Sequence, residues 1–568
     1  MPSSSRAPPS SGTARRATAT LEHDRSACGE STSGRGDGRY APHGGAPWVD
    51  ARDRTSILLI VAAFFVLGAA VSGDLGITAD EPETLRAGQR NLEIIAAWWA
   101  GEPLPDWSFH ELTGFYFVLD TARALWIRAT GSFGFEPYHA LHLFHLALSA
   151  ATIALLYALT RVVGAPHRAA LFAALALATL PKFVAHAQTN PKDLPATFVF
   201  ALALYGVIAT GVRGGLPRAL LSGAALGLAL TTRVHAVFAP LIGWSWLVLT
   251  NPRLTRRDTL LQLALLLSGA ASALLFWPWL WSAPIDNALS ALRGLGDKIF
   301  SIPVLYLGSV QPANEIAWHY RSVLLLATTP LSWCVLAGLG LTTLRQESTK
   351  GAARLAVLWV AVLWLADGLV WSRYDGIRHF LMALPALALL AGLGADRAMH
   401  WVETSDAPHA LRGLPLLPFA IGLLSIAALH PYPNAVLGAP ARALAGPDTS
   451  ESYELDYWGQ SYREAGRWLA THREPEAEVI VPLFGNLARL SITGPVRDGV
   501  VSDWLPTDRP RYLVVLTRRA YWDEPLHRLE QEQEPMFEVR RSGGRLLAIY
   551  RNAADSAGSA GGPARGGS

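Results

Sequence analysis

The feature that most constrains this chain is a series of apolar blocks, each roughly 17–25 residues long. An α-helix of that length crosses the hydrocarbon core of a bilayer with all of its backbone hydrogen bonds satisfied internally. Only 16% of the residues are charged, whereas soluble domains carry about 25%. The sequence therefore predicts a polytopic α-helical membrane protein with about eleven transmembrane helices. The blocks lie at roughly 55–73, 138–160, 168–186, 194–212, 217–231, 234–250, 259–280, 321–344, 352–371, 377–395 and 412–430.

The loops between these blocks predict the orientation. If the N-terminus is cytoplasmic, the N-terminal tail and one set of short loops are rich in Lys and Arg, as the positive-inside rule requires. Residues 217–250 are either two short helices broken at "TTRVH" or one long helix with a buried Arg233. The broken form keeps the alternation of loops, so it is favoured.

The predicted domains follow from composition. Residues 1–52 are rich in Ser, Gly, Pro and Arg and predict a disordered cytoplasmic tail, and 553–568 predict a flexible tail. Residues 53–432 form the transmembrane domain. Its first outer loop, 74–137, contains amphipathic stretches such as "LRAGQRNLEIIAAWWAG" that predict helices lying on the membrane surface. In residues 433–552, the helical pattern "YREAGRWLATH" and the strand patterns "AEVIVPLF" and "RYLVVLT" predict a small extracytoplasmic α/β domain.

Several charged residues fall together on the predicted outer side, where the positive-inside rule depletes Lys and Arg. Basic side chains near hydrocarbon need a partner, and a bound anion would supply one. Each residue alone also has an ordinary interpretation as a solvated helix end, a rigid turn or a snorkelling side chain. The candidates are Asp80 and Glu81, Lys192 and Asp193, Arg233, and Arg378 and His379.

A carboxylate among cations at an outer surface suits a lipid-linked phosphate substrate. The cations would bind the phosphate and make it a better leaving group, while the carboxylate would accept a proton from an attacking hydroxyl or amine. A single displacement of this kind inverts the anomeric configuration. No Gly-rich nucleotide-phosphate motif occurs, which argues against a nucleotide sugar, and the histidines lack metal-ligand spacing. We therefore expect neither a metal nor a cofactor.

The chain resembles the membrane glycosyltransferases of the C superfamily (GT-C), in the bacterial branch related to protein O-mannosyltransferases and aminoarabinose transferases (family 39-like). The resemblance is carried by "ITADEPETLRAG", "HAQTNPKDLPATFVFALAL", "GLALTTRVHAVFAP", "RYDGIRHFLMALPALALLAG" and "HPYPNAVLGAP" with "YELDYWGQSYREAGRWL". It implies a polyprenyl-phosphate sugar donor, transfer on the non-cytoplasmic face, and Asp80 as the catalytic base. Lys192, Asp193 and Arg378 match the family's outer-loop Lys-Asp and arginine.

The predicted function is thus an inverting glycosyltransferase of the plasma (inner) membrane whose active site faces the periplasm or exterior. Its acceptor is a lipid, a glycan or a protein, and it has no nucleic-acid partner. Two alternatives stay open. One is a transporter or flippase of a lipid-linked saccharide, for which Asp367 within "WLADGLV" is the one deep ionisable residue. The other is an O-antigen-ligase-like enzyme that uses a pyrophosphate-linked donor.

Overall fold

A computed structural model describes residues 51–103, 116–251, 253–281, 283–296, 301–368, 373–405, 408–504 and 510–552. All described residues belong to one compact unit, Tyr40–Ser568. The predicted tails at 1–52 and 553–568 therefore lie almost wholly outside the described residues.

The described part of the chain is dominated by long apolar helices. Seven are long and apolar enough to cross a membrane, and they correspond to α1 (Ala51–Val71), α4 (Pro137–Val162), α7 (Asp193–Arg213), α10 (Arg256–Phe276), α14 (Lys350–Gly368), η6 (Arg378–Ala383) with α15 (Leu384–Thr404), and η7 (His409–Leu416) with α16 (Leu417–Leu429). This confirms the polytopic helical fold class and a multi-pass membrane protein.

The remaining predicted blocks coincide with broken or short helices. α12 (Tyr320–Thr328) and α13 (Leu331–Leu341) meet at a bend of 111°, because Pro330 lacks the N–H that would continue a helix. The shorter apolar helices are α5 (His167–Thr179), α8 (Leu216–Leu230) and α9 (Phe238–Thr250), the last preceded by η3 (Val234–Val237). Helix α8 ends at Leu230 and helical structure resumes at Val234, so the prediction that residues 217–250 form two short helices is confirmed. The described residues thus contain seven helices that could cross a membrane, or eight if the bent pair is one span, where the sequence predicted about eleven. The difference is the three short helices, which fall below the length that a span needs.

Small residues let the helices pack closely. In α8, Gly223 and Gly227 form a G-x-x-x-G pattern against α10, where a Cβ on Gly223 would lie 2.4 Å from the carbonyl oxygen of Leu265. In α15, a Cβ on Gly394 would lie 1.9 Å from the carbonyl oxygen of Leu336 in α13. Backbone approaches of this kind are the usual way in which membrane helices gain packing contacts. α7 and α15 supply much of the buried core.

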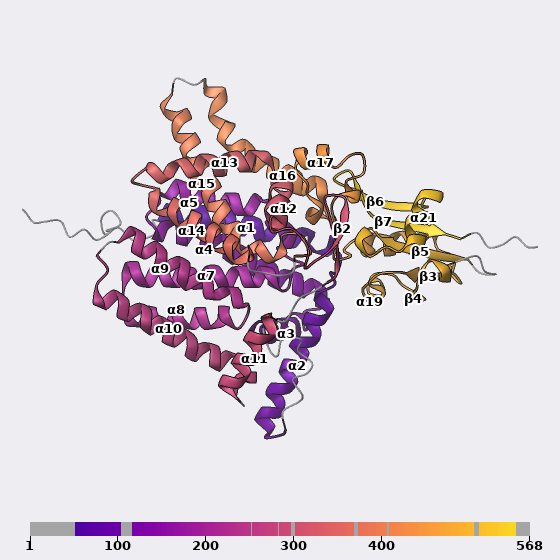
Figure 1. The fold of residues 1–568 in the computed structure, drawn as a ribbon, viewed down its shortest axis with the longest axis horizontal. Coiled ribbons are helices and arrows are strands. Elements are labelled where there is room, and N and C mark those ends of the chain that lie inside the picture. Colours follow the sequence, from indigo (N-terminus) through magenta and orange to yellow (C-terminus); the bar gives the residue numbers. More distant parts are fainter. Residues whose placement is uncertain are drawn as a thin grey trace, which may run out of the picture. The chain divides into compact units, whose positions relative to one another are not determined.

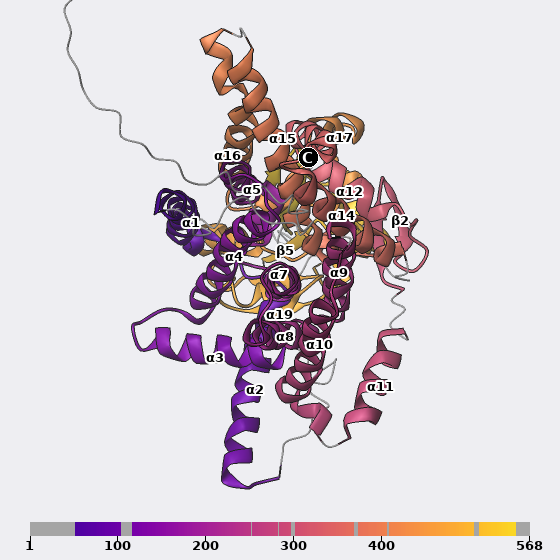
Figure 2. The same ribbon diagram turned by 90° about the vertical axis from the view of Figure 1, so that its left-hand side faces the viewer.

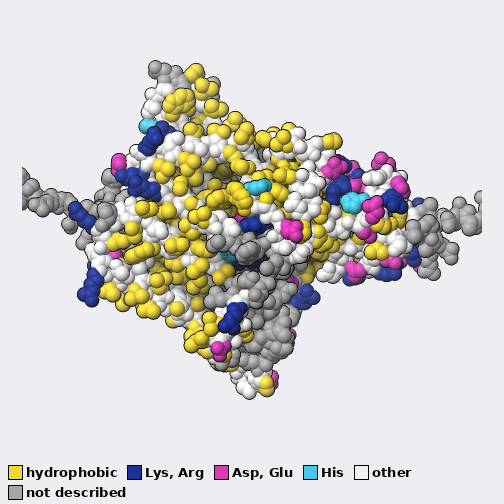
Figure 3. Space-filling model, viewed as in Figure 1, with side chains coloured by type: hydrophobic (Ala, Val, Ile, Leu, Met, Phe, Trp, Pro, Cys, Tyr) yellow, Lys and Arg dark blue, Asp and Glu magenta, His cyan; other side chains and the backbone are white. Residues whose placement is uncertain are grey.

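The outer faces of the bundle are apolar. Hydrophobic side chains predominate over the middle of the helical part, whereas charged side chains gather over the strands at the right and Lys and Arg lie along the left edge (Figure 3). Only 11% of α1's apolar window and 22% of α10's are buried within the chain. These helices therefore present apolar surface that suits lipid contact.

The predicted first outer loop contains two helices, α2 (Glu81–Ala100) and α3 (Phe117–Gly131), and residues 104–115 of it lie outside the described part. α2 extends away from the bundle and α3 runs across its base (Figure 2). Near its end α2 exposes Trp98 and Trp99, at 55% and 77%. Exposed tryptophans on an amphipathic helix fit the predicted position at a membrane interface. Residues 282–320 add α11 (Pro284–Gly296) and an antiparallel pair, β1 (Pro303–Tyr306) and β2 (Ser309–Pro312).

The C-terminal part is a small α/β domain beside one end of the helices (Figure 1). Its sheet has the order β4-β3-β5-β7-β6; β3, β4 and β5 are parallel, and β7 is antiparallel to β5 and β6. The bounds are α18 (Tyr462–His472), β3 (Glu478–Val481), β4 (Val496–Asp498), β5 (Arg511–Leu516), α21 (Glu524–Glu532), β6 (Phe537–Arg541) and β7 (Gly544–Arg551). The predicted helix and both predicted strands are present as α18, β3 and β5. Because β3 and β5 are parallel, the residues that follow them share one edge of the sheet.

Candidate active site

The candidate site forms where the N-terminal ends of three helices meet. Asp80 is the N-cap residue of α2, Lys192 is the N-cap residue of α7, and Arg378 begins η6. Prolines near the starts of α2 and α7 favour helix initiation at these points. The Asp80 carboxylate lies between the two cations: Oδ1 is 3.1 Å from Lys192 Nζ, and Oδ2 is 2.9 Å from Arg378 Nη1. The structure thus brings together three predicted residues that are far apart in the sequence.

A second carboxylate anchors another cation beside them. Asp193 pairs with Arg233, and its other oxygen lies 3.8 Å from Arg378 Nη1. Arg233 also donates a hydrogen bond to the Tyr116 hydroxyl at 3.1 Å. Asp193 is 1% exposed, so its charge is compensated inside the protein rather than by water. Arg233 and Asp193 therefore belong to the same ionic network as Asp80.

The network continues into the C-terminal domain through Asp375. Oδ2 of Asp375 is 3.0 Å from Arg378 Nη2, and Oδ1 accepts a hydrogen bond from Arg518 Nη2 at 2.6 Å. Arg518 also donates to the backbone carbonyl of Tyr457 at 3.1 Å, and its Nε lies 3.6 Å from Glu454 Oε1. Acids and bases therefore alternate along one path from α2 to the residues that follow β5.

The electrostatics keep the central groups charged. Burial alone would raise the pKa of Asp80, but the nearby Arg378 and Lys192 outweigh it and hold that pKa below its usual value. Burial would lower the pKa of Lys192, but Asp80 and Glu83 raise it. Burial, with a contribution from Asp375, raises the pKa of Glu454 to about 7. At neutral pH, Asp80 is a carboxylate held by two cationic donors.

Two predicted site residues lie outside this network. Glu81 accepts hydrogen bonds from the backbone N–H of Thr78 at 2.6 Å and from its hydroxyl at 3.0 Å, and its other oxygen is 2.9 Å from His142 Nε2. It is fully buried and ties the start of α2 to α4. His379 Nδ1 lies 3.2 Å from Arg321 Nη2, so this histidine contacts a different arginine from the two that surround Asp80 and Asp193.

Asp367, predicted to lie deep in a span, is in the last turn of α14 and is neutralised locally. It pairs with Arg321, and its backbone carbonyl accepts a hydrogen bond from Arg373 at 3.1 Å. A carboxylate paired in this way serves to hold the end of α14 against its neighbours. Within the described residues, no group of three or more His, Cys, Asp or Glu side chains is arranged to hold a metal ion.

Three residues with unusual backbone angles contact the arginines. Five of the described non-glycine residues have positive φ, and among them Tyr116, Asp375 and Phe484 have values of 67°, 53° and 54°. Tyr116 binds Arg233, Asp375 binds two arginines, and the Phe484 ring lies 5.9 Å from the Arg518 guanidinium. Such conformations persist only where the surroundings enforce them, and they cluster at functional sites.

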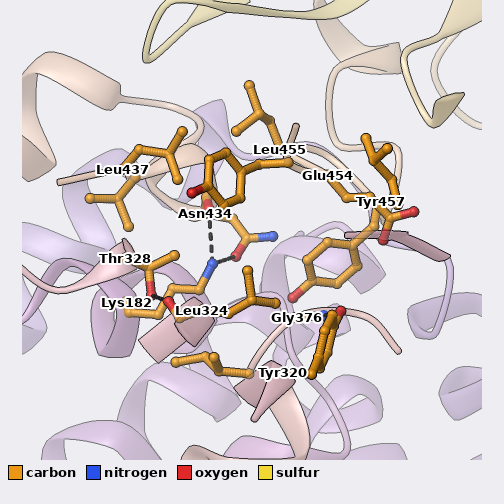
Figure 4. Close-up of a pocket in the computed structure, with 14 residues that line it drawn as sticks. Lys182, Tyr320, Leu324, Thr328, Gly376, Asn434, Leu437, Glu454, Leu455 and Tyr457 are labelled. Carbon is orange, nitrogen blue, oxygen red and sulfur yellow. Dashed lines mark hydrogen bonds between the residues drawn. The ribbon is translucent and has the colours of Figure 1, made fainter. Parts of the chain in front are cut away.

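A small cavity adjoins the network where the C-terminal domain meets the helices. Its volume is about 30 Å³, enough for about one water molecule. Lys182 points its amine at Asn434 and donates to the backbone and side-chain oxygens of that residue at 3.0 and 2.7 Å (Figure 4). Glu454 and Gly376, which follows Asp375, line the same cavity. The cavity therefore lies at the interface between the transmembrane helices and the C-terminal domain.

Sequence reasoning missed several members of the network. Glu83, whose Oε2 is 3.1 Å from Lys192 Nζ, lies in the first turn of α2, and Asp375 lies inside the stretch "RYDGIRH". Both could have been found from their charge and position. Tyr116 and Arg518 carry no such signal, because only the tertiary fold brings them to Arg233 and Asp375.

A protein-family model matches the middle of this chain. Residues 126–281 match the model of the family described as dolichyl-phosphate-mannose-protein mannosyltransferase. The matched segment contains Lys192, Asp193 and Arg233, whereas Asp80 and Arg378 lie outside it. No curated protein matches the sequence.

Solved structures give further likenesses. ArnT from Cupriavidus metallidurans bound to undecaprenyl phosphate has 16% identity and a TM-score of 0.45, covering 88% of this chain and 98% of that one. The arabinofuranosyltransferase AftD from Mycobacteria has 15% identity and a TM-score of 0.44, covering 88% and 40%. The S. cerevisiae protein O-mannosyltransferase Pmt1-Pmt2 complex bound to the sugar donor has 19% identity and a TM-score of 0.30, covering 46% and 41%. The family match confirms the predicted resemblance: over residues 126–281 this chain is similar to the dolichyl-phosphate-mannose-protein mannosyltransferases.

Proposed function

We propose that this protein transfers a sugar from a polyprenyl-phosphate donor to an acceptor on the extracytoplasmic face of the membrane, with inversion at the anomeric carbon. The observation that carries the proposal is the Asp80 carboxylate held between Lys192 Nζ and Arg378 Nη1 at 3.1 and 2.9 Å. One base and a pair of phosphate-binding cations are what a single displacement of a phosphate leaving group needs.

In the proposed reaction the donor phosphate takes hydrogen bonds from Lys192 and Arg378. The acceptor oxygen or nitrogen attacks the anomeric carbon as the bond from that carbon to the phosphate oxygen breaks. Asp80 receives the proton of the acceptor, and the polyprenyl phosphate leaves with the bonding electrons. The two cations stabilise the charge that develops on the departing phosphate. Attack opposite the leaving group inverts the configuration.

Donor binding also prepares the base. In the ligand-free site, Arg378 and Lys192 hold the pKa of Asp80 low, which makes it a weak proton acceptor. A phosphate that draws these cations toward itself weakens their hold on Asp80. The pKa of Asp80 then rises toward its usual range, and the carboxylate becomes a better base. The base is thus strengthened when the donor is present.

The proposed donor class is supported by the family match, whose description names a dolichyl-phosphate sugar. The proposed face is supported by the arrangement of the ends: Asp80, Lys192 and Arg378 meet at the end of the bundle that contacts the C-terminal domain. The basic short loops lie between the opposite ends of the helices, and these loops are expected in the cytoplasm. An inner-membrane protein with this orientation has its site on the periplasmic side.

The test uses the full chain purified into lipid nanodiscs. Mass spectrometry of the copurifying lipid identifies the donor, and a panel of polyprenyl-phosphate and polyprenyl-pyrophosphate sugars measures release of the carrier lipid and the anomer formed. We expect release from monophosphate donors only, with inversion, and loss of turnover in Asp80→Asn by about 10²–10⁴-fold. Turnover with pyrophosphate donors alone would favour the ligase-like alternative. Movement of glycan across vesicles without release of carrier would favour a flippase.

A further inference from the structure

The C-terminal domain contributes a buried arginine to the ionic network of the proposed active site. Arg518 lies just after β5, at the sheet edge that β3 and β5 share, and it reaches Asp375 at 2.6 Å. Asp375 in turn holds Arg378 at 3.0 Å, and Arg378 holds Asp80 at 2.9 Å. We propose that Arg518 is a positioning residue that, through Asp375, holds the Arg378 guanidinium where it serves Asp80 and the donor phosphate. This inference rests on the proposed function for its catalytic meaning.

Arg518 is built in more firmly than an ordinary surface ion pair. It is 5% exposed, and its guanidinium lies over the Tyr521 ring at 4.5 Å and the Phe484 ring at 5.9 Å. It donates to the Tyr457 backbone as well as to Asp375. Stacking and two directed hydrogen bonds fix the planar fork in one orientation, which a flexible lysine would not reproduce.

Asp375 works as a bridge because its two oxygens serve different arginines. Oδ1 accepts from Arg518 and Oδ2 faces Arg378 Nη2. The bridging carboxylate leaves Nη1 of Arg378 available to reach Asp80. Asp375 and the following Gly376 have positive φ values of 53° and 66°, backbone angles that aspartate and glycine accept in a turn.

Loss of Arg518 would change how Arg378 is shared between Asp375 and Asp80. Asp375 would have one cationic partner left, so the Arg378 guanidinium would be drawn toward Asp375 and away from Asp80. The donor phosphate would then lose one preplaced cation, and the pKa of Asp80 would rise. The C-terminal domain is therefore needed for a competent site, although its sheet bears no reacting group.

The experiment compares Arg518→Met with a matched control, Arg519→Met. Arg519 is the next residue, is also buried in part and pairs with Glu530 in the same domain, and makes none of the contacts described for Asp375. Binding of undecaprenyl phosphate to the full chain in nanodiscs is measured by tryptophan fluorescence or calorimetry. We expect Arg518→Met to weaken binding at least tenfold, Arg518→Lys to recover part of the loss, and Arg519→Met to bind as the unmodified protein does.

The acid limb of the plot of kcat/KM against pH distinguishes a loss of positioning at Arg378 from a general loss of stability. In Arg518→Met it should move to higher pH with the raised pKa of Asp80, whereas a variant that only loosens the domain would lower the fraction of active protein without moving the limb. If Arg518→Met does not fold, the comparison is made between Asp375→Asn and the double variant Asp375→Asn with Arg518→Met, because a neutral side chain at position 375 needs no cationic partner. There, adding Arg518→Met should change binding little.

The outcomes distinguish this inference from the proposed function. Binding and pH limb equal to those of Arg519→Met would overturn the positioning role while leaving transfer intact. Lost binding in Arg518→Met, in a protein that transfers no sugar from any donor, would support the positioning role and overturn the glycosyltransferase. A protein that binds no undecaprenyl phosphate at all would overturn both.

Discussion

Replacement of Asp80 by Asn gives the sharpest test of the network, because it should weaken catalysis and strengthen phosphate binding together. In the ligand-free site, Asp80 occupies Lys192 and Arg378 with two charge-assisted hydrogen bonds, at 3.1 and 2.9 Å. A phosphate must compete with the carboxylate for both donors. Hydrogen bonds to charged groups contribute about 1 kcal/mol more than neutral ones, so an amide is easier to displace by about 2 kcal/mol over the two bonds. That difference corresponds to about thirtyfold tighter binding.

The assay is titration of undecaprenyl phosphate into nanodiscs that contain Asp80→Asn or the unmodified protein, beside a turnover measurement. Glu83→Gln is the matched control: Glu83 contacts the same Lys192 Nζ at 3.1 Å, but its side chain is 41% exposed and makes no contact with Arg378. It loses one such bond instead of two, at a more exposed side chain, so it should tighten binding by no more than about fivefold and leave turnover near normal. Weaker or unchanged binding in Asp80→Asn would refute the reasoning, since it would mean that Lys192 and Arg378 are not the phosphate donors.

Three further outcomes follow from the packing and the charges. Gly394→Ala should lower the melting temperature in detergent because its Cβ would lie 1.9 Å from a backbone oxygen of α13, whereas Gly338→Ala, with nothing within 4 Å, should leave it unchanged or raise it; equal melting temperatures would contradict the close packing of α13 and α15. Lys192→Met removes a charge that lowers the pKa of Asp80, so the acid limb of kcat/KM should move to higher pH, and an unmoved limb would argue against their coupling. Burial raises the pKa of Glu454 in the folded state from 4.5 to about 7, so the folded protein keeps this proton at pH values where the unfolded chain loses it. The free energy of unfolding therefore declines by on the order of 3 kcal/mol as the pH rises through that window. In Glu454→Gln the melting temperature should depend less on pH between pH 5 and 8, and an equally steep dependence would count against this burial effect.

The alternation of acids and bases explains how a cationic site can stay ordered without its ligand. Lys192, Arg233 and Arg378 each have a carboxylate partner in the described network. Buried cations without counter-charges would be costly and would move or lose their charge. Held in pairs, they stay in place, and an arriving phosphate needs only to exchange partners with them. Preorganisation of this kind lowers the reorganisation that binding and catalysis would otherwise require.

The sequence alone determined the membrane character, the positions of the apolar helices and the short list of charged candidates. These features are local, because the length of an apolar block decides whether it spans a bilayer and an Asp or Lys at a block's end needs no partner to be noticed. The break at "TTRVH", the helix at "YREAGRWLATH" and the strands β3 and β5 were equally visible, since each follows from periodicity within about ten residues. The strands β4, β6 and β7 were missed, because pairing with distant strands decides short segments of mixed composition.

Only the tertiary structure decided which charges meet. It placed Asp80 with Lys192 and Arg378, turned Glu81 toward His142, and brought Arg518 from the far end of the chain to Asp375. Charge and predicted side of the membrane could narrow the candidates but could not say which carboxylate faces which cation. That pairing depends on directions set by helix ends and turns many residues apart. An ionic contact exists only within a few ångströms, and no pattern along the chain encodes so short a distance between segments so remote.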